Sequence, residues 1–336
     1  MAASPPLVLC LGEALVDRLG PLGGDPASAP AGDCDDRLGG APANVACALA
    51  RLGRRAAFLG RLGRDPAGEA LAALFRARGV DTSGLQWDAE RPTRIVLVRR
   101  DLAGERQFGG FAGNRGEGFA DEALQAGTLP QQASWLLVGT LPLAGGAAAA
   151  LDRAVEQAGI AGVALAVDVN WRPTFWDDTA PPDAAPRPEQ AAAMLALLQR
   201  AALLKCAAEE AQWLFGSADP EQVRAALPQQ PAVVVTDGAA PLRWCLGRSS
   251  GVMAPYRVPV LDSTGAGDAF TAGLLHGLVA RPDLLGGQDG LAVEQLMRFA
   301  SGCGALVCQG AGAIDPQPTA AQVEAFLAAR QSGPPH

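Results

Sequence analysis

The stretch Val260-Leu-Asp-Ser-Thr-Gly-Ala-Gly-Asp-Ala-Phe-Thr-Ala-Gly273 is the most informative part of this chain. A strand end is expected to run into Gly265, Ala266 and Gly267, and Asp268 then opens an apolar helix. The first turn of a helix leaves backbone N–H groups without intrahelical partners, and the helix dipole adds positive charge there. Because small residues let an anion approach this backbone closely, the pattern predicts an anion site at a helix start.

Asp268 lies in the first turn of that helix, beside the expected anion. It could accept the proton of a hydroxyl group that attacks phosphorus. An ordinary turn, in which Asp268 only complements the helix dipole, is the other interpretation. A short glycine motif does not decide between them.

A second glycine-rich stretch, Leu38-Gly-Gly-Ala-Pro-Ala-Asn-Val-Ala46, lies near the N-terminus. Gly39 and Gly40 would let a polar ligand touch the backbone, and the amide of Asn44 can both donate and accept hydrogen bonds. The same residues also suit a tight turn followed by a helix start at Pro42. Both interpretations stay open on local grounds.

Polar residues also follow other expected strands. Asp17 could hold two sugar hydroxyls or be a solvated strand end. Another buried strand is expected to end at Asp168-Val-Asn-Trp-Arg172, and open α/β sheets bind ligands at such strand ends. Arg172 could pair with a phosphate group there, or it could form a structural ion pair. Glu209 and Glu210 open a later helix, where they could complement its dipole or face the water shell of a magnesium ion.

Short apolar runs alternate with segments of helical period along most of the chain. The expected strands are residues 7–11, 56–60, 135–138, 163–168, 202–205 and 232–236. The expected helices are residues 42–52, 67–78, 147–158, 189–200 and 209–215. Such alternation predicts an α/β fold with a parallel sheet covered by helices on both faces. Hairpin-like strands at 242–246 and 251–258 and three final helices complete the pattern.

Two segments, at about residues 14–37 and 93–112, do not fit a layered core. Their β-rich character predicts strands that project from the main sheet, where a small lid could form. No linker separates two independent units, so a single domain over residues 1–336 is expected. The proline-rich stretch 178–188 is expected to be a surface insertion.

Composition excludes several kinds of enzyme. Lys205 is the sole lysine among 336 residues and is followed by Cys206, so a P-loop, which needs Gly-Lys-Ser/Thr, is absent. The histidines are His276 and His336, which leaves little material for a His-rich zinc site or a Ser-His-Asp hydrolase. A nicotinamide dehydrogenase would need GxGxxG after the first strand, and the sequence has none there.

Net charge and cysteine content indicate which partners and which cellular compartment are expected. The net charge of −8 argues against a nucleic-acid partner, because such proteins need a basic face. Seven cysteines without a CxxC pair are typical of reduced thiols in a cytoplasmic protein. No stretch approaches the roughly 18 apolar residues of a membrane span, so no membrane partner is expected.

Taken together and in this order, the motifs resemble the ribokinase-like (PfkB-type) carbohydrate kinases, and most of all the bacterial fructokinases. The likeness covers about residues 7–328. The stretches that carry it are residues 12–17, 38–46, 61–68, 92–98, 104–108, 168–173 with Trp176, 209–215, 262–268 and 310–318.

The resemblance implies a three-layer α/β/α fold with a mostly parallel central sheet and a small β lid that closes over the sugar. It implies ATP and Mg²⁺ as partners and allows a potassium-like ion and a homodimer. Asp268 would be the base that takes the proton of the sugar hydroxyl. The backbone of Gly265, Ala266 and Gly267 would hold the developing charge of the phosphoryl group, with Arg172 near the phosphates.

The resemblance also implies roles for further residues. Those that would bind the sugar are Asp17, Gly39, Gly40, Asn44, Phe108, Asn170 and Asp268. Those that would meet the nucleotide are Lys205, Thr236, Gly238, Gly265 and Gly267. Glu210 would hold Mg²⁺ through water, and Asp262 and Thr264 are candidates for a monovalent cation.

Two positions depart from the family pattern. Ala207 stands where an asparagine is common, and Pro241 replaces a glycine near the expected nucleotide site, where it removes an N–H group.

The activity expected first is transfer of the γ-phosphoryl of ATP to D-fructose, which gives fructose 6-phosphate. The alternatives are a kinase for ribose, 2-keto-3-deoxygluconate or a nucleoside, and a sugar-binding regulator that has lost catalysis.

Overall fold

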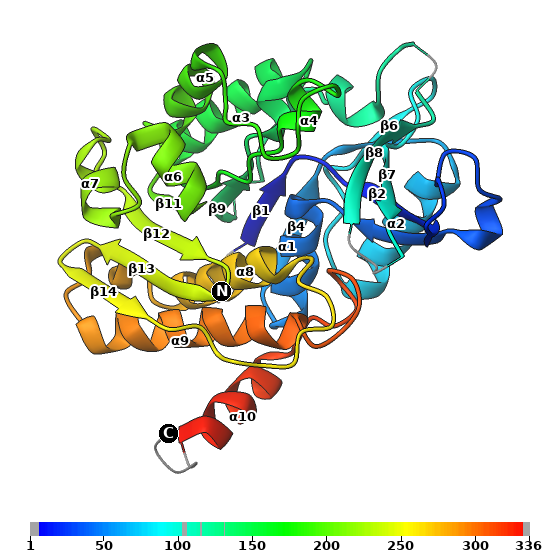
Figure 1. The fold of residues 1–336 in the computed structure, drawn as a ribbon. Helices are drawn as coiled ribbons and strands as arrows, with labels where there is room; N and C mark the ends of the chain where they lie inside the picture. The colour runs from blue at the N-terminus through cyan, green and yellow to red at the C-terminus, as the bar shows by residue number, and fades with distance from the viewer. Residues whose placement is uncertain (1–6, 103–105, 115, 131, 332–336) are drawn as a thin grey trace.

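The computed structural model describes residues 7–102, 106–114, 116–130 and 132–331, and its largest sheet runs through the middle (Figure 1). The order of its strands is β14-β13-β12-β11-β10-β9-β1-β4. From β12 to β4 neighbouring strands are parallel, and β13 and β14 form an antiparallel edge. These strands are β1 (Leu7–Leu11), β4 (Arg55–Leu59), β9 (Ala133–Val138), β10 (Ala164–Asp168), β11 (Leu203–Ala207), β12 (Ala232–Asp237), β13 (Ala240–Leu246) and β14 (Ser249–Met253).

Helices cover both faces of this sheet, as expected for apolar parallel strands (Figure 1). The α-helices are α1 (Ala41–Arg51), α2 (Pro66–Arg78), α3 (Ala148–Ala161), α4 (Pro173–Trp176), α5 (Pro188–Leu198), α6 (Ala208–Phe215), α7 (Pro220–Ala225), α8 (Ala266–Ala280), α9 (Gly290–Val307) and α10 (Ala320–Gln331). The 3₁₀ helices are η1 (Ala31–Asp33), η2 (Ala120–Ala123), η3 (Leu141–Ala144) and η4 (Pro282–Gly286). None of the helices in the described ranges has the length and apolar character needed to cross a membrane.

Strand β1 shows how the two layers of the core are divided. Its side chains alternate between the two faces of the sheet, because successive residues of a strand point in opposite directions. Val8 and Cys10 join the apolar cluster that contains residues of α1, α8 and α9. Leu7, Leu9 and Leu11 join the cluster that contains residues of α3, α5 and α6. The strand is buried throughout, as a strand covered by helices on both faces should be.

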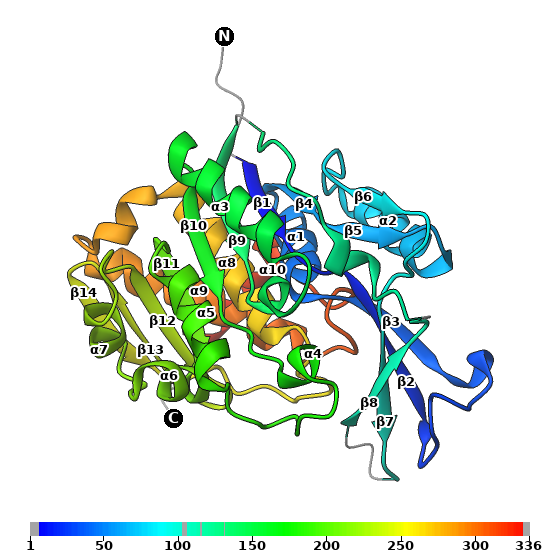
Figure 2. The same ribbon diagram turned by 90° about the horizontal axis from the view of Figure 1, so that it is seen from above.

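A second sheet, with the order β3-β2-β7-β8, lies to one side of the main sheet (Figure 2). Its strands are β2 (Leu15–Leu22), β3 (Asp35–Gly39), β7 (Ile95–Arg100) and β8 (Arg106–Ala112). They come from the two segments that were predicted to project from the core. β2 and β7 pair in parallel, and the outer pairs are antiparallel. A short parallel pair, β5 (Arg61–Gly63) and β6 (Gln86–Asp88), forms a third sheet.

The α/β/α layering is confirmed, and several predicted boundaries are wrong. The strand predicted at 251–258 ends at Met253, and Asp262 is not preceded by a strand. Prolines at 255 and 259 explain this, because proline cannot donate a ladder hydrogen bond. Helix α3 continues past residue 158 to Ala161 and ends at Gly162. Within the predicted lid motif 104–108, residues 104 and 105 lie outside the described residues.

Candidate functional site

Helices α1 and α8 pack against each other and bring Asn44 and Asp268 together. The Asn44 Nδ2 group donates a 2.8 Å hydrogen bond to Asp268 Oδ2, although 224 residues separate the two. Asn44 is buried, and its Oδ1 atom accepts no hydrogen bond from any described residue. A buried acceptor without a partner is costly, so this oxygen is available to a ligand hydroxyl.

The Asp268 carboxyl group has a shifted pKa. Burial is the largest cause and raises it; the hydrogen bond from Asn44 opposes burial, and the pKa lies at about 6. The negative charge of Asp168 also raises it, whereas the charges of Lys205 and Arg172 lower it. A carboxyl group with this pKa is ionised at neutral pH and is more basic than an ordinary aspartate. It is therefore suited to accept a proton from an alcohol.

The start of α8 has unpaired N–H groups, as predicted for an anion site, but Ala266 is not one of them. Its N–H donates to the Ser263 carbonyl at 3.2 Å. Within the described residues, the N–H groups of Gly265 and Gly267 donate to no acceptor. Gly265 has a φ of 78°, and a Cβ there would lie 2.5 Å from the Cβ of Ala313. Glycine is therefore needed for both the backbone conformation and the close packing.

The predicted sugar residues Asp17, Gly39 and Asn44 lie side by side. A Cβ placed on Gly39 would be 3.6 Å from Asp17 Oδ2 and 3.7 Å from Asn44 Oδ1. Gly40 has a φ of 102° and a backbone so close to Glu13 that a Cβ would lie 2.6 Å from its carbonyl oxygen. The end of β3 and the start of α1 thus form one polar surface that faces the Asp268 carboxylate.

Residues after β10 approach the same place. Asn170 has a φ of 44°, an uncommon backbone conformation for a non-glycine residue. Arg172 is exposed, donates from Nη1 to the Trp171 carbonyl at 3.0 Å, and lies near enough to lower the pKa of Asp268. These observations agree with the predicted position of Arg172 near Asp268. Among the described residues, the Asn170 side chain makes no hydrogen bond to Asp268.

Lys205, predicted to meet the nucleotide, is held beneath α8. Its Nζ atom donates to both Asp168 oxygens at 3.0 Å, and the side chain is 12% exposed. Burial opposes the charged form, but the Asp168 carboxylate prevails and raises the pKa of Lys205. Thr271 Oγ1 lies 3.0 Å from Asp168 Oδ2 and 3.0 Å from the Gly267 carbonyl oxygen. Sequence reasoning missed Thr271, whose only local signal is its spacing of four residues from Gly267.

The other predicted nucleotide and metal residues lie at the ends of β11 and β12. Thr236 Oγ1 donates to the Cys206 carbonyl at 3.4 Å, and Gly238 is exposed in the turn after β12. Glu210 is buried, and its two oxygens accept hydrogen bonds from the N–H groups of Trp171 and Ala207. Burial raises the Glu210 pKa. Its oxygens therefore already support the local backbone, which is compatible with a magnesium ion only through water.

Asp262 and Thr264, the candidates for a monovalent cation, are joined in the loop before α8. Asp262 Oδ1 accepts hydrogen bonds from Thr264 N and Oγ1 at 3.0 and 2.7 Å. Asp262 Oδ2 accepts one from Gly312 N at 2.8 Å. The carboxylate thereby ties this loop to the loop before α10. Among the described residues, no group of three or more His, Cys, Asp or Glu side chains is placed to hold a metal ion.

Phe108 lies on β8 and makes an edge contact with Phe111 at 5.1 Å between ring centroids. Phe111 in turn contacts Phe175 of α4 at 5.1 Å. The Arg94 guanidinium lies 5.0 Å from the Phe111 ring centroid and 4.3 Å from that of Phe119. Aromatic side chains of the small sheet and the main body thus surround one cation at the base of β7.

Arg94 also forms ion pairs that sequence reasoning missed. Its Nε and Nη2 atoms bond both oxygens of Asp121 at 2.8 and 3.0 Å, and Nη2 bonds Glu122 Oε1 at 2.7 Å. These three residues and Glu13 line a cavity of about 30 Å³. Glu13 is buried, with Oε1 accepting from Ala41 N and Oε2 without a partner among the described residues. Burial raises the pKa of Glu13 to about 7.

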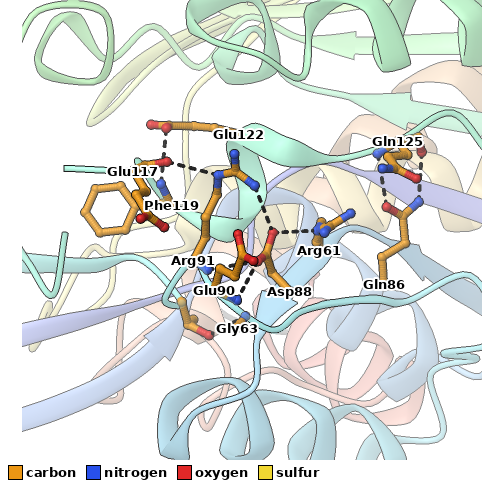
Figure 3. Close-up of polar contacts among 11 residues, drawn as sticks. Arg61, Gly63, Gln86, Asp88, Glu90, Arg91, Glu117, Phe119, Glu122 and Gln125 are labelled. Atoms are coloured by element: carbon orange, nitrogen blue, oxygen red, sulfur yellow. Dashed lines mark hydrogen bonds and ion pairs between the residues drawn. The ribbon is translucent and has the colours of Figure 1, made fainter. Parts of the chain in front are cut away.

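The segments that enter and leave the small sheet are joined at their base (Figure 3). Asp88 Oδ2 accepts from Arg61 Nε at 2.9 Å, and Asp88 Oδ1 accepts from the N–H groups of Glu90 and Arg91. Although burial opposes it, these bonds hold the pKa of Asp88 at about 2. Arg91 Nε donates to the Glu117 carbonyl at 2.9 Å. The chain before β7 is therefore fastened to the chain after β8.

Comparison with known proteins agrees with this arrangement. A family model described as pfkB family carbohydrate kinase matches residues 5–320. Fructokinase-1 of Oryza sativa subsp. japonica is 34% identical over 328 residues, which cover 96% of this chain and 98% of the relative. Fructokinase-1 of Zea mays is also 34% identical, over 332 residues that cover 96% of this chain and 98% of the relative.

Two solved structures share the fold along nearly the whole chain. The fructokinase of Xylella fastidiosa with bound ATP has a TM-score of 0.81 and 28% identity, covering 97% of this chain and 99% of its own. The fructokinase of Vibrio cholerae O395 in its fructose, ADP and calcium ion bound form has a TM-score of 0.78 and 30% identity, covering 96% and 99%. Since the family model and these relatives each span most of its length, the chain belongs to the pfkB family of carbohydrate kinases.

Proposed function

We propose that this protein is an ATP-dependent fructokinase, which transfers the γ-phosphoryl group of ATP to D-fructose and releases fructose 6-phosphate and ADP. The observation that carries the proposal is the Asn44–Asp268 pair at the start of α8, beside the N–H groups of Gly265 and Gly267. This place brings together the Asp268 carboxylate with its raised pKa, the unpartnered Asn44 amide oxygen and the N–H groups at the helix start. The fructokinase relatives support fructose as the acceptor.

In the proposed reaction, Asp17, Gly39 and Asn44 bind the sugar and direct one hydroxyl toward the Asp268 carboxylate. Asp268 accepts the hydroxyl proton as the oxygen attacks the γ-phosphorus, and the bond to ADP breaks on the opposite side. The Gly265 and Gly267 N–H groups stabilise the negative charge of the transferring group. Each transfer moves one phosphoryl group and releases one proton.

ATP enters as the second substrate, with a divalent ion that neutralises phosphate charge when bound. Glu210 would hold Mg²⁺ through water, because this ion keeps most of its water ligands. Thr236 and Gly238 would lie along the nucleotide, with Arg172 near its phosphates. We assign a monovalent cation, if the reaction uses one, to the loop held by Asp262 and Thr264.

The small sheet would act as a lid over the sugar, with Phe108 facing the pocket. Closure would exclude water, which otherwise competes with the sugar as phosphoryl acceptor. All seven cysteines are free thiols, which supports a reducing compartment such as the cytoplasm.

The test is ADP release measured over a panel of fructose, ribose, 2-keto-3-deoxygluconate and nucleosides. The highest kcat/KM is expected on fructose. A higher value on another acceptor would reassign the substrate within the family, and sugar binding without ADP release would indicate a regulator. Direct detection of fructose 6-phosphate confirms the product.

Asp268→Asn tests the base. The variant keeps a similar shape but cannot accept a proton, so kcat should fall by about 10³-fold while ATP still binds. Asp152→Asn, on the exposed face of α3, is the matched control and should retain wild-type kcat. An active Asp268→Asn enzyme would refute the assigned role.

A further inference from the structure

Glu13 lies against the turn that precedes α1. Its carbonyl oxygen would be 2.6 Å from a Cβ placed on Gly40, so the two backbone segments approach each other closely. Its side chain reaches the same turn, because Glu13 Oε1 accepts a 3.0 Å hydrogen bond from Ala41 N. The side chain is buried, and the two bonded residues are 28 positions apart in the sequence. Glu13 therefore contacts this turn with both its backbone and its carboxyl group.

The residue before α1 cannot supply this hydrogen bond. The first N–H groups of a helix lack intrahelical acceptors, and the side chain just before the helix commonly accepts a bond from one of them. Gly40 occupies that position and has no side chain. An N–H group that loses water without gaining an acceptor costs free energy. The carboxyl group of Glu13 thus supplies an acceptor from a distant segment of the chain.

The same turn carries groups that we assigned to sugar binding. Gly39 and Gly40 directly precede Ala41. Asn44 N donates to the Gly40 carbonyl at 2.8 Å, and the Asn44 side chain donates to Asp268 Oδ2 at 2.8 Å. A displacement of the Ala41 N–H group would therefore move both the glycine backbone and the Asn44 amide.

We propose that Glu13 is a positioning residue for sugar binding: its Oε1 atom holds the Ala41 N–H group and thereby sets the Gly39–Gly40 backbone and Asn44 in the geometry that receives the sugar. The inference rests on the proposed kinase function and adds a residue that acts through the turn instead of touching the substrate. Because the turn belongs to the sugar side of the site, ATP binding should not depend on Glu13.

Three replacements of Glu13 separate the acceptor from its reach and from packing. Glutamine has the length of glutamate and keeps an oxygen acceptor without the charge. Aspartate keeps the charge, but its carboxylate is one methylene group shorter. Leucine has a similar size and offers no acceptor. If the hydrogen bond to Ala41 N is what matters, glutamine should replace glutamate best.

Steady-state kinetics, together with calorimetric titration of fructose, test this order. Glu13→Leu should raise the fructose KM and Kd by at least about 10-fold, because the Ala41 N–H group is left unsatisfied. Glu13→Gln should stay near the wild-type values, and Glu13→Asp should lie between the two. The KM for ATP should stay near wild type in all three variants. A general loss of stability would lower the amount of active enzyme without raising the fructose KM alone.

The matched control removes the same kind of bond from a helix start outside the site. Asp289 Oδ1 accepts from Ala292 N at 3.0 Å at the start of α9. The opposite end of α9 is the one that approaches α8 near its start, where Gly304 packs against Ala266. Asp289→Ala should therefore destabilise the protein, as loss of a helix cap does, and leave the fructose KM unchanged.

Two results would overturn the proposal: folded Glu13→Leu protein with wild-type fructose KM and Kd, or a Glu13→Gln variant as impaired as Glu13→Leu. If Glu13→Leu does not fold, the other two variants decide. A higher fructose KM for Glu13→Asp than for Glu13→Gln supports the proposal, and equal values overturn it.

The same experiments distinguish this inference from the proposed function on which it rests. If wild-type protein phosphorylates none of the sugars, the proposed function fails. An active wild type with an unchanged fructose KM in folded Glu13→Leu protein refutes the role of Glu13 alone.

Discussion

At the scale of single residues, burial and hydrogen bonding give three carboxyl groups very different proton affinities. Asp268 has a pKa of about 6 and Glu13 one of about 7, both raised mainly by burial. Asp88 is buried as Glu13 is, and burial opposes its charged form, but backbone N–H groups and Arg61 hold its pKa at about 2. The difference lies in the number of donors that each carboxylate receives. Only the first two groups can change charge near neutral pH.

The Asp268 pKa predicts the pH dependence of turnover. A base works when it is deprotonated, so kcat/KM should rise through about pH 6 and level off above it. The measurement is kcat/KM for the sugar between pH 4.5 and 8.5, with unfolding monitored at each pH. A profile that stays flat through pH 6 in folded protein would contradict this assignment.

Glu13→Gln should reveal the cost of ionising a buried carboxyl group. The folded-state pKa of Glu13 is about 7, which exceeds the ordinary value of 4.5. The stabilising contribution of this group is therefore complete below pH 4.5 and is lost as the pH rises through 7. The variant should gain roughly 2 kcal/mol in unfolding free energy relative to wild type between pH 5 and pH 8. Urea titrations at both pH values measure this difference.

The matched control is Glu156→Gln on the exposed face of α3, for which no such pH-dependent difference is expected. A Glu13→Gln variant whose relative stability is the same at pH 5 and pH 8 would show that Glu13 does not titrate in this range.

Sequence reasoning singled out residues near glycine-rich motifs and missed residues whose hydrogen-bond and ion-pair partners are distant in the sequence. Asp268 and Asn44 were recognised from glycine-rich helix starts, which have a local pattern. Glu13 lies between β1 and β2 and Arg94 just before β7, and their hydrogen-bond partners are 27 to 28 residues away. Long-range ion pairs leave no periodic signal, so only the fold reveals them.

At the scale of elements, the predicted buried strands and helices agree with the structure to within about two residues at most ends. Alternation of apolar and helical segments is a strong signal because each buried strand must be apolar on both faces. The pair β5 and β6 was not predicted, since strands of three residues are too short to show a period. Helix α7, of six residues, was missed for the same reason.

Arg94→Met should loosen the junction between β7 and η2. The change leaves Asp121, whose side chain is 11% exposed, without its bidentate partner, and breaking such a buried pair costs about 3 kcal/mol. Urea unfolding should show this loss. Arg281→Met, which breaks an exposed pair with Asp283, is the control and should leave the unfolding midpoint in place. Equal losses of unfolding free energy in the two variants would show that burial does not make the Arg94–Asp121 pair more stabilising than an exposed pair.

At the scale of the whole molecule, the two sheets differ in how much of their surface is buried. The main sheet is covered by helices on both faces, whereas the small sheet projects to one side (Figure 2). Ion pairs of Asp88 and Arg94 connect the segments before β7 to the main body. The small sheet is therefore the part of the fold best placed to move as a unit.

Hydrogen–deuterium exchange should detect that movement. Amides of β7 and β8 are expected to exchange faster than those of β10, and fructose should slow them because the proposed lid would close. The hairpin of β13 and β14, at the opposite edge of the main sheet, serves as the internal control. Fructose binding that protects the central strands but not β7 and β8 would contradict closure.

The hydrogen bond between Asn44 and Asp268 has a consequence for how the protein is made. Its donor belongs to the first helix, and its acceptor is translated 224 residues later. A ribosome-bound chain that has not yet released α8 therefore has the proposed sugar residues without the carboxyl group that we propose as the base. Under that proposal, phosphoryl transfer is expected only after about four-fifths of the polypeptide has been synthesised.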